Sequence, residues 1–228
     1  MRRHTLPFFG LEFNPTKINV IFARTQSQVM DYDNKKVAGL LFVVAVVQYV
    51  LVVVISESIY SGYSVGQQYL SDLGDWSVAG NNAAIFNGSA LLWGIFLIAG
   101  AYFIQQIFKN RLFTSLLAIS GVGAVVSAVV SLNISFEVHG MFGLVAFVFG
   151  AASAIVSYKL LKSPLCFISI ILGAVTLSAT VLFMLGQGNS DFYLGLGVGG
   201  IERFVVYPFL LWMLGFGAYL IGDSSNKE

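Results

Sequence analysis

Six long apolar runs restrict the fold of this chain more than any other feature. Each has roughly 20 residues or more, enough for an α-helix with a rise of ~1.5 Å per residue to cross the ~30 Å hydrocarbon core of a bilayer. Only 10% of the residues are charged, whereas soluble domains carry about 25%. The sequence therefore predicts an all-α fold, a polytopic membrane bundle of six transmembrane helices. The runs cover residues 37–56, 83–107, 112–132, 138–158, 165–186 and 201–221.

The basic residues predict how these helices are oriented. Lys and Arg accumulate on the cytoplasmic side of a membrane because they resist translocation. Of the 12 Lys and Arg residues, all except Arg203 precede the first run, follow the last, or lie in the second or fourth connection. We therefore expect a multi-pass protein of the cell membrane with both termini cytoplasmic. The basic residues in this pattern are Arg2, Arg3, Lys17, Arg24, Lys35, Lys36, Lys109, Arg111, Lys159, Lys162 and Lys227.

The runs also divide the chain into three parts. Residues 1–34 are expected to form a cytoplasmic N-terminal tail, residues 35–222 a six-helix transmembrane domain, and residues 223–228 a second cytoplasmic tail. Met1 and Met30 are both candidates for the native start, since the segment after Met30 makes an ordinary short cytoplasmic lead. The connections on the basic side are very short, so a site is expected on the outer face.

Small residues within the runs predict where helices approach each other closely. Lipid tails supply no hydrophobic drive between helices, so contacts rely on side chains that let backbones approach. We expect such contacts at Gly94, Gly100, Gly121, Gly123, Ser127, Ser131, Gly140, Gly143, residues 150–153, Gly215 and Gly217.

Polar and ionisable residues gather at one depth, the outer ends of the spans. Such residues need partners in or near a membrane, and they often mark function. Their common depth predicts an outer-face polar cluster that binds a lipid headgroup or a partner subunit. The candidate residues are Ser71, Asp72, Asn87, Glu137, His139, Glu202, Arg203 and Tyr207.

Arg203 is the most informative member of this cluster because its position violates the charge bias. Its planar guanidinium suits a carboxylate or a phosphate. One interpretation is an ion pair with Asp72 or Glu137 that pins the first outer loop to the bundle. The alternatives are an anionic lipid headgroup or substrate, and snorkelling to water. Pro208 removes one backbone donor, so we expect the helix to loosen near Phe204.

No catalytic residue, metal or cofactor is predicted. Cys166 is the only cysteine, and His139 is the only histidine within a run, whereas metal and haem sites need several ligands. Ser71 and Asp72 with His139 suggest a hydrolase, but nothing near them resembles a strained nucleophile turn. A hydrogen bond from His139 across the bundle is the favoured interpretation. The net charge of +1 gives no attraction to nucleic acid.

Three short motifs occur in a characteristic order. Tyr69-Leu70-Ser71-Asp72-Leu73-Gly74 follows the first run, His139 opens the fourth, and Gly200-Ile201-Glu202-Arg203 opens the sixth. In the order of these motifs and in its six-span topology, the chain resembles the domain of unknown function 998 family, six-span membrane proteins of bacteria and archaea. The resemblance covers roughly residues 35–222, and the stretch 202–212 is most similar to archaeal members. The resemblance implies the fold and points to Ser71, Gly74, His139, Glu202 and Arg203, without implying an activity.

Three classes of function stay open. The favoured one is a non-catalytic membrane protein whose partners are membrane lipids, a membrane partner subunit or further copies of itself, and not nucleic acid. The second is an enzyme that modifies lipids at the outer leaflet, with His139 and Asp72 as acid and base. The third is a small-solute or proton transporter. The middles of the spans argue against it because they hold few ionisable groups, and Gln48 is the main polar residue there.

Overall fold

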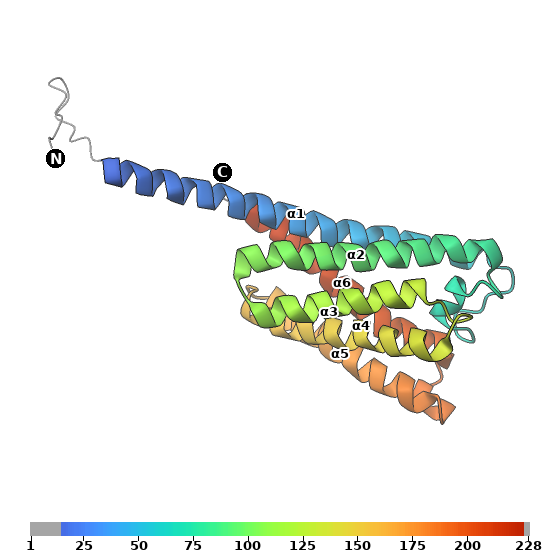
Figure 1. Ribbon diagram of the computed structural model, residues 1–228. Helices are drawn as coiled ribbons and strands as arrows, with labels where there is room; N and C mark the ends of the chain where they lie inside the picture. Colours follow the sequence, from blue (N-terminus) through green and yellow to red (C-terminus); the bar gives the residue numbers. More distant parts are fainter. Residues whose placement is uncertain (1–14, 226–228) are drawn as a thin grey trace, which may run out of the picture.

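The computed structural model describes residues 15–225, and this part of the chain is mainly α-helical (Figure 1). Six of its helices are long and apolar enough to cross a membrane. They are α1 (Pro15–Ile59), α2 (Ala83–Phe108), α3 (Arg111–Val129), α4 (Phe136–Val156), α5 (Leu165–Gly186) and α6 (Gly197–Ser225). The short 3-10 helices are η1 (Leu70–Gly74), η2 (Gly80–Asn82), η3 (Ser157–Lys159) and η4 (Ser190–Tyr193). The prediction of an all-α fold with six long apolar helices is confirmed, and these helices are consistent with a six-span membrane bundle.

Helix α1 is longer than its apolar run. It begins at Pro15, and only its part from Asp33 to Ile59 has the hydropathy of a span. Pro is favourable at a first helical position, and no further Pro interrupts the segment up to Ile59. Residues 15–34 of the expected tail therefore continue the first span as a helix. Residues 1–14 lie outside the described residues, and the choice between Met1 and Met30 stays a prediction.

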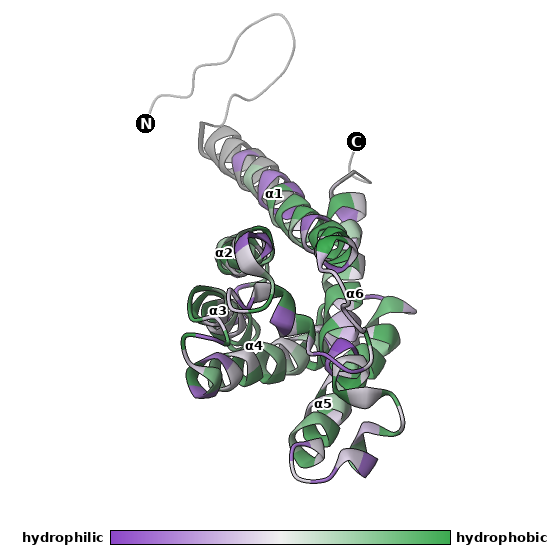
Figure 2. Ribbon diagram, turned by 90° about the vertical axis from the view of Figure 1, so that its right-hand side faces the viewer, coloured by the Kyte–Doolittle hydropathy of each residue, from purple (hydrophilic) through white to green (hydrophobic). Residues whose placement is uncertain are grey.

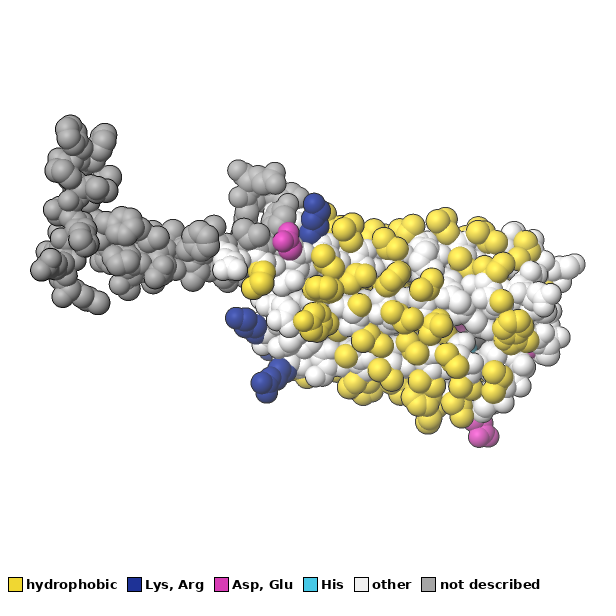
Figure 3. Space-filling view, turned by 45° about the horizontal axis from the view of Figure 1, so that its top comes forward, with side chains coloured by type: hydrophobic (Ala, Val, Ile, Leu, Met, Phe, Trp, Pro, Cys, Tyr) yellow, Lys and Arg dark blue, Asp and Glu magenta, His cyan; other side chains and the backbone are white. Residues whose placement is uncertain are grey.

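Consecutive helices pack side by side, and α6 closes the bundle by packing against both α5 and α1 (Figure 2). The connections at one end are short and basic, and we call it the basic end. The other end, here the long-loop end, carries residues 60–82, 130–135 and 187–196. Figure 3 shows exposed Lys and Arg side chains at the basic end and hydrophobic side chains over the middle. The assignment of the basic end to the cytoplasm stays a prediction.

The interior of the bundle is built from aromatic side chains of α6 and its neighbours. Trp212 is fully buried and stacks on Phe209 and Phe216, with ring centroids 5.5 and 5.3 Å apart. Phe42 of α1 and Phe113 of α3 pack against the same Phe216 ring. This aromatic core lies in the half of the bundle near the basic end.

Glycines set the closest helix contacts. A Cβ at Gly94 would lie 3.0 Å from the carbonyl oxygen of Gly121, and one at Gly123 would lie 2.6 Å from the amide nitrogen of Ala146. Gly100, Gly150 and Gly217 are equally enclosed, so the small-residue prediction is confirmed at these positions. It is wrong for Gly140, where an added Cβ would meet no atom within 4 Å because that turn of α4 faces open space.

Candidate functional site

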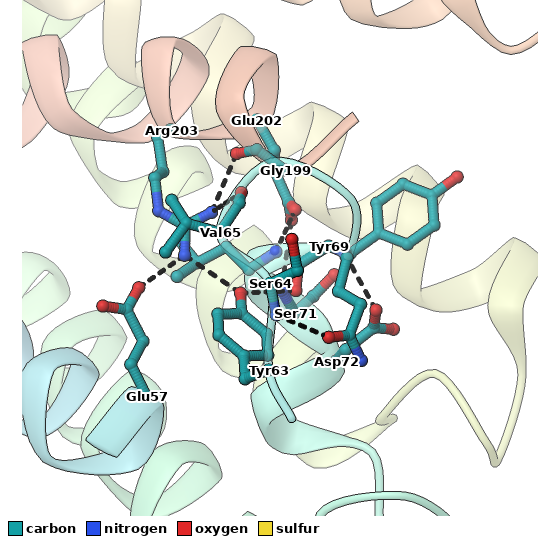
Figure 4. Close-up of polar contacts among 12 residues, drawn as sticks. Glu57, Tyr63, Ser64, Val65, Tyr69, Ser71, Asp72, Gly199, Glu202 and Arg203 are labelled. Atoms are coloured by element: carbon teal, nitrogen blue, oxygen red, sulfur yellow. Dashed lines mark hydrogen bonds and ion pairs between the residues drawn. The ribbon is translucent and has the colours of Figure 1, made fainter. Parts of the chain in front are cut away.

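Arg203 lies in the second turn of α6, and its side chain turns toward the loop that follows α1 (Figure 4). The guanidinium forms an ion pair with Glu57 and donates a 2.9 Å hydrogen bond to the Tyr63 hydroxyl. It also donates to the carbonyl oxygens of Val65 and Gly199, at 3.0 and 2.9 Å. The residue is only 8% exposed. Arg203 therefore ties three segments together: the end of α1, the first loop and the start of α6.

The partner of Arg203 differs from the one predicted. We expected an ion pair with Asp72 or Glu137, and the structure pairs Arg203 with Glu57 instead. The reason is that α1 continues to Ile59 and packs against α6. Glu57 lies in the last turn of α1 and is therefore next to Arg203. The predicted pinning of the first loop is present, through Tyr63 and Val65. Helix α6 runs through Pro208 without a break, and the expected loosening near Phe204 stays a prediction.

Glu202, the neighbour of Arg203, holds a different part of the loop. Its carboxylate accepts hydrogen bonds from the backbone N–H groups of Leu70 and Ser71, the latter at 3.3 Å. These donors open η1 and have no partner within so short a helix. Asp72 supports the same turn, because its carboxylate accepts a 2.9 Å bond from the Tyr69 N–H. Burial raises the pKa of Asp72, and that hydrogen bond works in the opposite direction.

Tyr63 links these two anchors. Its hydroxyl donates to the carbonyl oxygen of Tyr69 at 2.9 Å while it accepts from Arg203. Burial raises the pKa of Tyr63 to about 12, because a phenolate would lose its hydration. The hydroxyl therefore keeps its proton at neutral pH and remains a donor to the loop.

His139 opens α4 and joins it to α3. Its Nδ1 lies 2.9 Å from the carbonyl oxygen of Ser127 and 3.0 Å from that of Val130, so this nitrogen carries the proton. The Ser127 hydroxyl lies 3.2 Å from the same nitrogen. His139 therefore bonds to the neighbouring helix α3, and a proton-sensitive hydrogen bond across the bundle stays a prediction. Among residues 15–225, no hydrogen bond connects His139 to Ser71 or Asp72.

The remaining candidates play separate roles. Asn87 of α2 donates a 2.8 Å bond to the carbonyl oxygen of Gly74, and a Cβ at Gly74 would lie 2.2 Å from its side-chain oxygen. Glu137 is exposed in the first turn of α4, where a helix favours negative charge. Tyr207 is partly buried against the hydrophobic core. In the described part of the chain, no group of three His, Cys, Asp or Glu residues is placed to hold a metal ion.

A cavity of about 450 Å³ lies inside the long-loop end of the bundle. Five of the predicted residues line it, whereas Asp72, Arg203 and Tyr207 do not. Most of its wall is apolar or aromatic, with Tyr49, Phe86, Trp93, Phe136, Phe147 and Phe183 as the large side chains. The five predicted residues in the wall are Ser71, Asn87, Glu137, His139 and Glu202.

The mouth of the cavity lies between α4 and α5. Phe136 and Met141 of α4 and Met184 of α5 line the cavity and are more than half exposed on the outer surface of the bundle. Tyr69 lies across this gap, with its ring edge-on to Phe136 and Phe183. Its hydroxyl donates a 3.0 Å bond to Gln187. The loop anchored by Glu202 therefore forms one edge of the opening.

The aromatic wall of the cavity was not predictable from the sequence. Tyr49 and Trp93 lie in the middle of apolar runs, where an aromatic side chain is ordinary packing material. Nothing in their spacing separates a residue that faces a cavity from one that faces a neighbouring helix. The polar residues at the ends of the runs carried a signal, because each needs a partner.

Loss of the Glu202 carboxylate should release the start of η1. We expect Glu202→Ala to accelerate amide hydrogen exchange at Leu70 and Ser71 about tenfold or more, since two buried donors lose their acceptor. Glu202→Gln should have a smaller effect because one side-chain oxygen remains. Asp191→Ala, an exposed carboxylate in the other long loop, serves as the control. Unchanged exchange at both amides in Glu202→Ala would refute this anchoring role.

Comparison with known proteins gives one match. The family model described as "Protein of unknown function (DUF998)" matches residues 43–219, which include all six spans in whole or in large part. No curated protein and no solved structure matches the chain.

Proposed function

We propose a lipid-binding role for this chain, which belongs to the DUF998 family: a non-catalytic membrane protein that holds one amphipathic lipid in its cavity. The observation that carries the proposal is the cavity itself. Its volume of about 450 Å³ lies within the range of roughly 300–1,000 Å³ that is usual for small-molecule sites. Protein interiors are otherwise close-packed, with few voids larger than a water molecule. A space of this size is therefore best explained as a binding site for a small molecule.

The wall of the cavity favours an amphipathic occupant over a water-soluble one. Aromatic and aliphatic side chains provide most of the surface, and Glu202, Asn87 and Ser71 lie at the long-loop end. The mouth between α4 and α5 faces the side of the bundle, where exposed Phe136 and Met184 would contact lipid. A lipid could enter from the bilayer with its chain among the apolar residues and its head toward the loop.

Arg203 plays no direct part in this proposal. Its guanidinium donates to four protein groups and does not line the cavity. The polar cluster therefore divides into a structural half, with Arg203 at its centre, and a half that borders the cavity. A headgroup would meet the second half.

The two other functions have less support. An enzyme would need acid and base groups that meet, yet Asp72 binds the Tyr69 N–H and His139 binds carbonyl groups of α3. A transporter would need polar groups along the spans. The side-chain amide of Gln48 instead donates to the Ser89 carbonyl oxygen of α2 and accepts from the Ser89 hydroxyl. These bonds hold α1 against α2 and occupy the polar groups of Gln48.

Filling the cavity should weaken lipid retention. Gly143 lines the cavity, and a Cβ there would lie 3.7 Å from the Ser127 hydroxyl, an ordinary contact. We expect Gly143→Leu to lower the fraction of protein that retains a co-purified lipid about tenfold, as measured by native mass spectrometry after gentle delipidation. Gly88→Leu is the matched control, because Gly88 lies in a helix with no atom within 4 Å of an added Cβ and does not line the cavity. Equal retention by both variants would contradict the proposal.

A further inference from the structure

We propose that the Tyr49 hydroxyl recognises the head of the bound lipid, and that the cavity selects an uncharged head with a hydrogen-bonding oxygen, such as an alcohol. This inference rests on the proposed lipid-binding function and adds the chemical class of the ligand. It comes from one buried polar group without a partner and from the charges of the wall around it.

Tyr49 is a rigid, buried member of the cavity wall. It is 6% exposed, and its ring packs against Phe86 and Trp93 with centroid distances of 5.8 and 5.7 Å. Within residues 15–225 the Tyr49 hydroxyl has no hydrogen-bond partner. Ser56 and Thr176 also have buried hydroxyls without partners, but neither lines the cavity. Only Tyr49 of these three can therefore be satisfied by a molecule in the cavity.

The charges of the wall disfavour an anionic head. None of the residues that line the cavity is Lys or Arg, and Arg203 is committed elsewhere. The two acidic residues in the wall, Glu202 and Glu137, supply no positive charge either. A phosphate or a fatty-acid carboxylate would therefore lie in the cavity without a counter-ion, at a large cost in a medium of low dielectric constant.

A cationic head is also a poor fit. Both oxygens of Glu202 already accept N–H groups, from Leu70 and Ser71, and these bonds hold the loop. An ammonium group would have to compete with them, and Glu137 lies exposed at the rim, where water screens it. An alcohol needs no charge balance. It can accept a hydrogen bond from the Tyr49 hydroxyl.

The test uses four probes with the same sixteen-carbon chain, each with two bromine atoms in the chain. They are hexadecanol, palmitate, hexadecyltrimethylammonium and hexadecane, added at graded mole fractions to nanodiscs of neutral phosphatidylcholine that hold the full-length protein. Bromine quenches tryptophan at short range, and Trp93 lines the cavity. Trp76, which is 44% exposed, is replaced by Phe, while Trp212, fully buried and outside the cavity wall, stays as an unquenched reference.

We expect hexadecanol to quench Trp93 at about tenfold lower mole fraction than palmitate or hexadecyltrimethylammonium. Tyr49→Phe keeps the ring and should weaken hexadecanol about fivefold, the value of one hydrogen bond, while leaving hexadecane unchanged. Unchanged quenching by hexadecane also shows that the variant is folded. Tyr102→Phe, on an exposed tyrosine outside the cavity wall, should leave all four probes unaffected.

The outcomes separate the two proposals. Quenching by hexadecane without any preference for the alcohol would overturn the inference about the head and leave the lipid-binding cavity standing. Stronger binding of the cationic or the anionic probe, or equal loss of hexadecanol and hexadecane in Tyr49→Phe, would do the same. Failure of all four probes to quench Trp93 would overturn the proposed function, and the inference with it.

Discussion

Arg203→Ala should lower the free energy of unfolding by about 3–5 kcal/mol, the usual cost of removing one member of a buried ion pair. The variant leaves the Glu57 carboxylate, only 24% exposed, without its cation. It also removes the donors to Val65 and Gly199 and the bond to the Tyr63 hydroxyl. Reversible unfolding in mixed micelles of increasing denaturing-detergent content measures the change. Because three segments meet at this side chain, the loop before η1 should become protease-sensitive at the same time.

Two comparisons show whether the ion pair is the cause. Glu57→Gln retains an oxygen that can accept from Arg203, so it should cost less than Glu57→Ala. Arg111→Ala removes an exposed positive charge at the basic end and should change stability by less than about 0.5 kcal/mol. If Arg203→Ala and Arg111→Ala destabilise the protein equally, the four contacts of Arg203 contribute nothing specific to the fold.

Gly123→Ala should destabilise the bundle by about 2 kcal/mol, although Ala is the better helix former by about 1 kcal/mol. The added Cβ would lie 2.6 Å from the amide nitrogen of Ala146 and 2.7 Å from the carbonyl oxygen of Phe142. Both atoms belong to the backbone of α4, which cannot move aside as a flexible side chain can. Helix α4 would have to shift away from α3, and the 2.6 Å hydrogen bond from Ser120 to the carbonyl oxygen of Ala146 would lengthen.

The matched control for this change is Gly88→Ala. Gly88 also lies within a helix, but an added Cβ would meet no atom within 4 Å. This variant should be neutral or more stable by up to about 1 kcal/mol, because only helix propensity changes. The same unfolding assay serves for both glycines. Equal stability of the two variants would show that α3 and α4 are not held in the close contact described here.

Most of the architecture follows from local properties of the sequence. Apolar runs long enough to span a bilayer can satisfy their backbone only as helices, so number, type and approximate position of the spans are determined before any contact is known. The length of α1 was underestimated for the same reason. Hydropathy finds the part of a helix that lies in the membrane, whereas residues 15–34 are helical without being apolar.

The candidate site was predictable only in part. The polar residues at the long-loop end were identified because each needs a partner, and the bond of His139 across the bundle was among the expectations. The pairing was not predictable. Asp72, Glu137 and Glu57 are all carboxylates at similar depth, and only the packing of α1 on α6 selects Glu57 for Arg203. Asp72 instead caps the short helix η1, and Glu137 faces water.

Six long apolar helices, and a charge bias that predicts their orientation, can be recognised without any knowledge of tertiary contacts, because length, hydropathy and charge act on each segment separately. Tertiary packing is what makes Arg203 a structural anchor and what turns Tyr49 and Trp93 toward a cavity. These properties depend on which side chains of different helices meet, and the sequence pattern of an apolar run is the same whether its aromatic residues fill the core or leave a space beside it.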